Sequence, residues 1–543
     1  MRGWFALLGL VLAGFASAEA VDAPHPAFPP VAIDGEWITV GGERFLVVGV
    51  GYEAGTRPGR LPYTRDFRPD LLRADFERIR AAGFNAMRTW APLTDDELEL
   101  AAEYGLWVIQ GLWYDSEGDF ADPRFQEQVL ASVREEVKRG AKHPNILFYL
   151  IGNEPHADAV YEAGHDEMNA FYRRLIQAAR ECDPERLFSY ANCIFTDSMA
   201  PTMWDLTAQN AYPYSPVTIE KVLGYRAYLR ELKRKLAPGK PFIITEFGLS
   251  VSPTGDGRGY GGNTLEQQRD GMLALWDDVL SAGATGGCPF MWTDGWWKFR
   301  DENTHDDHAE EWYGFLATDD DFVGEPRPVY FALQDYQRAI RTLPIDGGRY
   351  ADSVDIEIWS PTARRVEARL NDGDWFTLEH QGSWWRGAAR LKDVPIGLHQ
   401  LHTRMQTRDG DWASEKTAYI NVVHKPDVDR ADYAVSLVGL PEQATLGGPL
   451  EVVVEVLDAD GRPVKGKAVQ LGRFFHGGWD EHEDSGVTDE QGQSVFSVPM
   501  PVYAGMVSVA ASVDGDKPAR NATGWKQSTA ERYVAYEHLE LVK

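Results

Sequence analysis

The sequence predicts a closed (β/α)₈ barrel followed by two all-β domains. From about residue 30 to 345, short apolar segments alternate with amphipathic helical patterns, which is typical of a parallel sheet. Eight such segments fall within roughly 300 residues, as a (β/α)₈ barrel requires. After Gly347, apolar and polar residues alternate at period two between frequent turn residues, which is typical of β-sandwiches.

The eight expected barrel strands can be placed along the chain. They are Phe45–Gly51, Phe84–Trp90, Leu106–Gln110, Ile146–Asn153, Leu187–Asn192, Ala208–Tyr212, Phe242–Phe247 and Cys288–Thr293. Helical periodicity separates most of them, for example over Asp70–Ala82, Arg124–Arg139 and Thr264–Ala282, and residues 328–341 are expected to form the last barrel helix. A doubly wound open sheet is the alternative, but Val50–Glu53 lacks the Gly-rich phosphate loop that normally follows its first strand.

The expected domains are a barrel over residues 25–345, a β-sandwich over 350–424 and a second β-sandwich over 434–543. The last domain carries a D-x-D-G-x-P-V turn at 458–464 and a T-D-x-x-G-Q turn at 488–493. In these segments it resembles bacterial immunoglobulin-like domains of the invasin type. Residues 1–18 are expected to be a signal peptide, because Arg2, the apolar run Trp4–Phe15 and Ala16-Ser17-Ala18 have the required order. The mature protein is therefore expected to be secreted or periplasmic.

Composition narrows the classes of partner. The net charge of -29 disfavours binding to nucleic acid and to anionic membranes, and no later segment is long and apolar enough for a membrane helix. Aromatic residues make up 12%, including 18 Trp, which suits either large cores or stacking on sugar rings. The three cysteines form no disulfide framework: buried free thiols are the simpler interpretation, although a Cys182–Cys193 bridge is possible.

Two glutamates stand out at the ends of expected strands. Glu154 follows strand four in Ile151-Gly-Asn-Glu-Pro155, and Glu246 ends strand seven in Ile243-Ile-Thr-Glu-Phe-Gly248. In a (β/α)₈ barrel the active site lies at the carboxyl ends of the strands. Cleavage of a glycosidic bond needs two carboxyl groups across one bond, and a separation of about 5–5.5 Å leads to retention of configuration. The alternative is that each acid caps a neighbouring helix, but two acids in these contexts favour catalysis.

The barrel resembles the clan A glycoside hydrolases, and its local sequence motifs are most similar to those of families 2 and 5. These motifs are, in chain order, IDGEWITVGGERFLVVGVGYE, GFNAMRTW, YGLWVI, HPNILFYLIGNEP and KPFIITEFG. The resemblance implies that Glu154 is the acid/base and Glu246 the nucleophile. The chain departs from the family 2 pattern in its domain order, because family 2 enzymes usually carry β-sandwiches before the barrel, whereas here the β-sandwiches follow it.

The same resemblance implies roles for further residues. Arg88 would hold Glu246 ionised, Asn153 would contact the sugar 2-hydroxyl and Tyr212 would bond the nucleophile. Trp292 would form the floor of the subsite for the cleaved sugar. Further candidate sugar platforms are Trp90, Trp113, Tyr114, Trp296 and Trp297, for each of which core packing is the alternative. The segment His305–His308 is expected to be a solvated loop rather than a metal site, and no cofactor is expected.

Three functions follow from this interpretation. The first is a retaining β-glycosidase that hydrolyses β-linked oligo- or polysaccharides through a covalent glycosyl-enzyme. The second is a transglycosylase on the same barrel. The third is a non-catalytic carbohydrate-binding or adhesion protein, which the two C-terminal β domains keep open even though both glutamates are present.

Overall fold

The computed structural model describes residues 28–543 apart from 65–66, 200–202, 215, 319–322 and 519–529. The expected signal peptide lies outside the described residues. The predicted barrel is confirmed: eight parallel strands close into a cylinder, in the order β10-β11-β4-β5-β6-β7-β8-β9. They are β4 (Val47–Gly51), β5 (Ala86–Arg88), β6 (Trp107–Leu112), β7 (Ile146–Asn153), β8 (Leu187–Asn192), β9 (Thr207–Asn210), β10 (Phe242–Phe247) and β11 (Gly286–Pro289).

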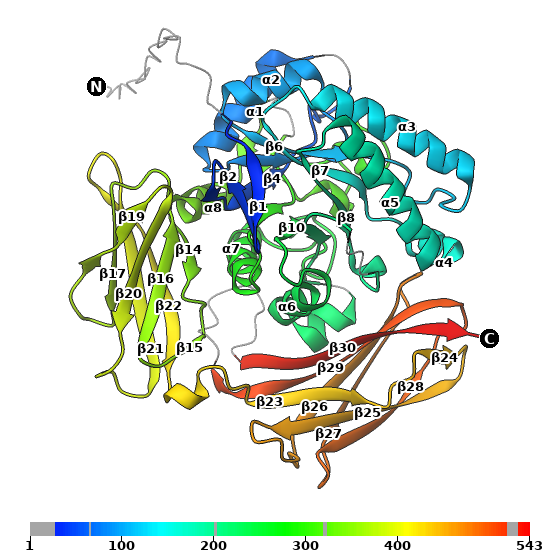
Figure 1. The fold of residues 1–543 in the computed structure, drawn as a ribbon, viewed down its shortest axis with the longest axis vertical. Coiled ribbons are helices and arrows are strands. Elements are labelled where there is room, and N and C mark those ends of the chain that lie inside the picture. The colour runs from blue at the N-terminus through cyan, green and yellow to red at the C-terminus, as the bar shows by residue number, and fades with distance from the viewer. Residues whose placement is uncertain (1–27, 65–66, 200–202, 215, 319–322, 519–529) are drawn as a thin grey trace, which may run out of the picture.

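Helices surround this cylinder in Figure 1. They are α1 (Pro69–Ala81), α2 (Asp95–Glu103), α3 (Pro123–Gly140), α4 (Ala157–Ala163), α5 (His165–Cys182), α6 (Tyr225–Leu236), α7 (Leu265–Ser281) and α8 (Pro328–Arg338). Two of these helices, α2 and α7, begin at capping boxes. Thr94 and Thr264 form capping boxes with Glu97 and Gln267, which satisfies amide groups that the first turn leaves free. The amino-terminal strands β1 (Val31–Asp34), β2 (Trp37–Val40) and β3 (Glu43–Arg44) form a separate small sheet.

Three barrel strands end earlier than the sequence pattern suggests. The second, β5, ends at Arg88 rather than Trp90, the sixth, β9, ends at Asn210 rather than Tyr212, and the eighth, β11, ends at Pro289 rather than Thr293. Beyond Pro289 the amide of Trp292 bonds to the carbonyl of Gly51 at 2.9 Å, but outside a continued ladder. The sequence stays apolar beyond these strand ends because the following residues still pack into the core. Hydrophobic periodicity cannot distinguish such buried residues from a continued strand.

The first β domain consists of two sheets, ordered β14-β16-β20-β19 and β15-β22-β21-β17-β18. Its strands are β14 (Ile340–Leu343), β15 (Arg349–Tyr350), β16 (Ser353–Trp359), β17 (Arg365–Leu370), β18 (Phe376–Thr377), β19 (Glu379–Gln381), β20 (Trp384–Arg390), β21 (Gly397–Gln406) and β22 (Trp412–Val422). Both sheets contribute to one apolar core, for example through Ile356 and Leu401.

The C-terminal domain, which follows the short helix η5 (Lys425–Asp427), also has two sheets, ordered β23-β25-β28 and β24-β30-β29-β26-β27. Its strands are β23 (Tyr433–Val438), β24 (Gln443–Thr445), β25 (Pro449–Asp458), β26 (Ala468–Phe475), β27 (Glu481–Val487), β28 (Gln493–Pro499), β29 (Gly505–Pro518) and β30 (Ala530–Val542). In Figure 1 this domain lies below the barrel, and β26 and β29 contact the π-helical turn η2 (Thr218–Leu223). Among the described helices, none is both long and apolar enough to span a bilayer.

Trp384 joins the first β domain to the amino-terminal sheet of β1, β2 and β3. Its ring is only 2% exposed and meets Trp37 edge-on with 5.5 Å between ring centroids. Its indole N–H donates to the carbonyl of Arg44 at 2.9 Å. The ring is therefore packed between domains rather than free to bind a glycan.

We predict that Trp384→Ala destabilises the protein by about 3–5 kcal/mol, because a buried tryptophan leaves both a cavity and an unpaired carbonyl. Thermal unfolding followed by circular dichroism should show the loss. Trp412→Ala is the matched control, because Trp412 is 41% exposed in the same domain. An unchanged melting temperature together with lost glycan affinity would instead make Trp384 a ligand contact.

Candidate active site

A cavity of about 350 Å³ opens at the carboxyl ends of the barrel strands and contains both glutamates singled out by sequence. It is lined by Trp90, Asn153, Glu154, Cys193, Ile194, Phe195, Asn210, Ala211, Tyr212, Tyr214, Ile219, Glu246, Tyr260, Phe290, Lys298, Glu310 and Trp479. Its size and its mixture of aromatic and convergent polar side chains are those of a small-molecule site.

The two carboxyl groups meet at one amide. The side-chain Nδ2 of Asn210 lies 2.9 Å from Oε1 of Glu154 and 2.7 Å from Oε1 of Glu246. The distance between the two carboxyl oxygens is therefore at most the sum of these two hydrogen-bond lengths. This limit is shorter than the roughly 6.5–9.5 Å at which inverting enzymes hold their carboxyl groups. The site has the spacing for retention.

The orientation of Asn210 is fixed from its other end. The hydroxyl of Thr245, the residue before Glu246, donates to Oδ1 of Asn210 at 2.7 Å. With the carbonyl oxygen engaged there, the NH₂ group faces the acids. Asn210 and Glu246 also pair directly across the β9–β10 ladder. The strand register therefore places the bridging amide.

Glu246 is 5% exposed and surrounded by hydrogen-bond donors. Arg88, at the end of β5, places Nη2 3.0 Å from Oε1. The indole N–H of Trp90 donates to the same oxygen at 2.9 Å, and the hydroxyl of Tyr212 donates to Oε2 at 2.8 Å. Both carboxylate oxygens of Glu246 are therefore held in place by donors, one of which is the Arg88 guanidinium.

Glu154 has the opposite electrostatic setting. Burial, followed by the charge of Glu246, raises the pKa of Glu154 to about 8, and only the Asn210 hydrogen bond and Arg88 oppose this. Its backbone has a φ of 45°, in the left-handed region that non-glycine residues rarely adopt. Such backbone strain clusters at functional sites. At neutral pH the group carries a proton, as a general acid requires.

The structure brings four of the predicted binding residues to this cavity. Trp90, Asn153 and Tyr212 line it. Arg88 lies beneath, with its guanidinium 3.9 Å from the centroid of the Trp90 ring and its Nη2 bonded to Oδ1 of Asn153. Asn153 also accepts from Asn210 at 3.1 Å.

Five predicted platforms lie outside the cavity lining: Trp113, Tyr114, Trp292, Trp296 and Trp297. Tyr114 is buried against Phe120, and the indole N–H of Trp297 donates to Glu53 at 2.8 Å. Trp292 is fully buried, and its N–H donates to Asp75 at 2.9 Å in the barrel core. It cannot form the floor that the resemblance implies, because β11 ends at Pro289 and Phe290 lines the cavity instead. Trp113 is 57% exposed beyond the rim, whereas Trp296 stacks on His305 with 4.5 Å between ring centroids.

Sequence reasoning missed Asn210 and Lys298. Asn210 has the signal that marks the glutamates, a polar residue at the end of a barrel strand, but the predicted sixth strand extends two residues further, to Tyr212. Lys298 carries no such signal. Its Nζ lies 3.0 Å from Oε1 of Glu53 and 5.1 Å from the Phe290 ring centroid, so the cavity also has a cationic group.

The thiols and histidines also have defined surroundings. All three cysteines are free, so the possible Cys182–Cys193 bridge is not formed. The ring of His305 lies between Trp296 and Trp312, in line with a structural role for this loop. Away from the cavity, Asp197, His476 and His538 place potential metal-ligand atoms within 4.8 Å of one another where the barrel meets the C-terminal domain.

Comparison with known proteins agrees with this geometry. Residues 31–276 match the family model described as glycosyl hydrolases family 2, TIM barrel domain. The chain is similar to the β-galactosidase large subunit of Leuconostoc lactis (27% identical over 232 residues, 39% of this chain and 32% of that protein). It is also similar to a β-galactosidase of Priestia megaterium (32% over 230 residues, 39% and 19%) and a β-glucuronidase of Streptococcus agalactiae (27% over 205 residues, 33% and 33%). The chain spans a third or less of the length of these relatives.

Among solved structures, a β-galacturonidase of Eisenbergiella tayi bound to galacturonate is 22% identical, with a TM-score of 0.46 over 57% of this chain and 54% of that one.

We predict that kcat/KM falls above about pH 8, where Glu154 loses its proton. In Asn210→Ala this alkaline limb should move to higher pH, because the Asn210 hydrogen bond lowers the pKa of Glu154. The rate below the limb should fall by about 10²-fold, as when a donor to reacting groups is removed. The pH profile of kcat/KM on an aryl β-glycoside measures both effects.

Gln209→Ala is the control for that profile, because Gln209 is the buried neighbouring amide on β9 but does not line the cavity. A limb that stays in place or moves to lower pH in Asn210→Ala would contradict the assigned role.

Proposed function

We propose that this chain, whose residues 31–276 match the barrel of the family 2 glycosyl hydrolases, is a retaining β-glycosidase. The observation that carries the proposal is the single Asn210 amide within hydrogen-bond distance of both carboxyl groups, of which Glu246 is paired with Arg88 and Glu154 has a raised pKa. Both acids then reach one anomeric carbon. The family match of the barrel supports the same chemistry.

In the first step, an oxygen of Glu246 bonds to the anomeric carbon while the bond to the glycosidic oxygen breaks. The proton of Glu154 moves to that oxygen, and the leaving sugar departs as an alcohol. The product is a glycosyl ester on Glu246. The charge of Glu246 is thereby removed, and with it one of the two main causes of the raised pKa of Glu154.

In the second step, Glu154 is a carboxylate and acts as base. It takes a proton from water, the water oxygen bonds to the anomeric carbon, and the ester bond breaks. Glu246 regains its negative charge, and Glu154 is again protonated. Two inversions leave the configuration retained.

β-Galactosides and β-glucuronides are the first substrates to test, since the relatives include β-galactosidases and a β-glucuronidase. We place the reaction outside the cytoplasm, on the basis of the signal-like residues 1–18. We also propose that the two β domains are immunoglobulin-like sandwiches, which the paired sheets and the turn motifs of the C-terminal domain support.

The test uses Glu154→Ala on aryl β-glycosides with good and poor leaving groups. Loss of the acid should slow poor leaving groups by about 10²–10⁴-fold and activated ones much less. Added azide should restore turnover and give a β-glycosyl azide, because the small anion needs no general base. Product chromatography with and without an acceptor sugar separates hydrolysis from transfer.

Glu246→Gln should abolish turnover of every substrate in the panel, since no ester can form. Glu162→Gln, on the exposed face of α4, is the control for charge removal alone. Full activity of Glu246→Gln would refute the mechanism, and a wild-type chain that binds these glycans without cleaving them would favour the carbohydrate-binding alternative.

A further inference from the structure

One wall of the cavity comes from a different domain. Trp479 lies in the connection between β26 and β27 of the C-terminal domain, yet it lines the cavity that holds Glu154 and Glu246. Its side chain is 72% exposed, the highest value among the described large apolar residues. A large aromatic ring left open to solvent beside a catalytic cavity is suited to a ligand rather than to a core.

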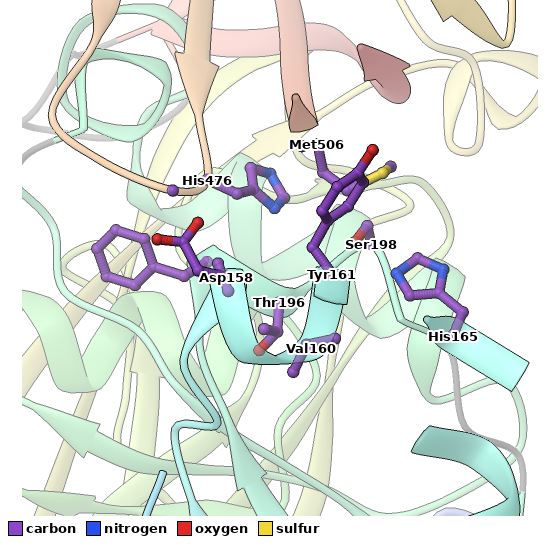
Figure 2. Close-up of a pocket in the computed structure, with 12 residues that line it drawn as sticks. Asp158, Val160, Tyr161, His165, Thr196, Ser198, His476 and Met506 are labelled. Carbon is purple, nitrogen blue, oxygen red and sulfur yellow. The ribbon is translucent and has the colours of Figure 1, made fainter. Parts of the chain in front are cut away.

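The connection that carries Trp479 is well supported. Arg473 forms an ion pair with Asp480 at 2.8 Å, and the amide of Phe475 bonds to the carbonyl of Asp480 at 3.0 Å, which closes the base of the connection. Figure 2 shows the small pocket behind it, where His476 and Met506 of this domain face Asp158 and Tyr161 of α4. The backbone that presents the ring is therefore packed against the barrel.

An aromatic chain connects the ring to both domains. Trp479 meets Phe195 edge-on with 6.1 Å between ring centroids, and Phe195 meets Phe474 of β26 at 5.6 Å. Phe195 belongs to the short helix η1 (Ile194–Thr196), which follows β8. The barrel rim and the C-terminal domain thus form one continuous surface here.

Polar contacts hold the domain in this position. The amide of Val217 donates to Glu481 at 3.0 Å, and Lys221 pairs with Glu483 at 2.7 Å. Deeper in the interface, Asp197 accepts from Tyr536 of β30 at 2.7 Å. Both strands that flank Trp479 are tied to the barrel, by Phe474 of β26 and by Glu481 and Glu483 of β27.

The position of the ring identifies which part of a substrate it would meet. Glu246 and its donors Arg88 and Trp90 surround the place of the sugar that becomes attached to the enzyme. Glu154 directly follows β7, and its amide bonds to the carbonyl of Ala191 in the neighbouring strand β8. Cys193, Ile194 and Phe195 of the cavity wall come after β8. This is the side of the acid, where the leaving group must lie.

We propose that Trp479 is a binding platform for the leaving-group sugar, and that the substrate is a β-linked oligosaccharide extending from the cavity onto the C-terminal domain. The inference rests on the proposed function, because it uses the direction of the cleaved bond. An aromatic face offers apolar area to the face of a sugar ring and keeps the polar edge hydrated. The C-terminal domain then acts as part of the active site.

The experiment compares Trp479→Ala with the wild-type full-length chain on two substrates that share the cleaved sugar. One is the aryl β-glycoside with the highest activity, and the other is the matching β-linked tetrasaccharide. We expect kcat/KM on the tetrasaccharide to fall by roughly tenfold to thirtyfold, the usual effect of truncating a tryptophan hot spot. The fall on the aryl glycoside should be several times smaller, and Trp479→Phe should recover most of the loss.

Trp412→Ala is the matched control, because its ring is also partly exposed but lies in the other β domain. Calorimetric titration of the tetrasaccharide into Glu246→Gln, with and without Trp479→Ala, gives a readout that needs no turnover. Weaker binding in the double variant supports the platform even if the wild type cleaves nothing, and in that case only the proposed function fails. Equal losses on both substrates, or unchanged titration, would overturn the platform.

Discussion

The site depends on one neutral amide placed between two acids. Asn210 offers hydrogen-bond donors to Glu154 and Glu246 without adding charge, and so holds the two carboxyl groups close to one another. A cation in its place would favour ionisation of both acids, and an apolar residue would leave buried oxygens unpaired. Arg88 then makes the surroundings of the two acids different, because its guanidinium forms an ion pair with Glu246.

The barrel makes this arrangement possible because neighbouring strands deliver neighbouring groups. β9 and β10 pair at Asn210 and Glu246, directly after an irregularity in their register, and Arg88 ends β5 across the cylinder. The C-terminal domain adds Trp479, an exposed aromatic ring that lines the same cavity. In the proposed mechanism the barrel supplies both acids and the C-terminal domain a further binding surface, and the two parts of the chain meet at η1 and η2.

The sequence predicted the barrel and the positions of its strands from their apolar periodicity. It singled out both glutamates because a carboxylate at the end of a buried strand is rare without a partner or a function. It also indicated Arg88, Asn153, Trp90 and Tyr212. It failed where three-dimensional packing decides. Trp292 and Trp113 look alike as tryptophans after barrel strands, but one is buried against Asp75 and the other lies beyond the rim. Trp479 is about 230 residues further along the chain than Glu246, and no local pattern shows that it returns to the same cavity.

The most direct test of the shared anomeric centre is the configuration of the first-formed sugar. Proton NMR of the anomeric signals should be recorded within minutes of adding the wild-type enzyme to a β-glycoside. The spacing imposed by Asn210 predicts that the β-anomer appears first and converts to the α-anomer only by slow mutarotation. Immediate appearance of the α-anomer would mean that water attacks directly between more widely spaced acids, and would contradict the account.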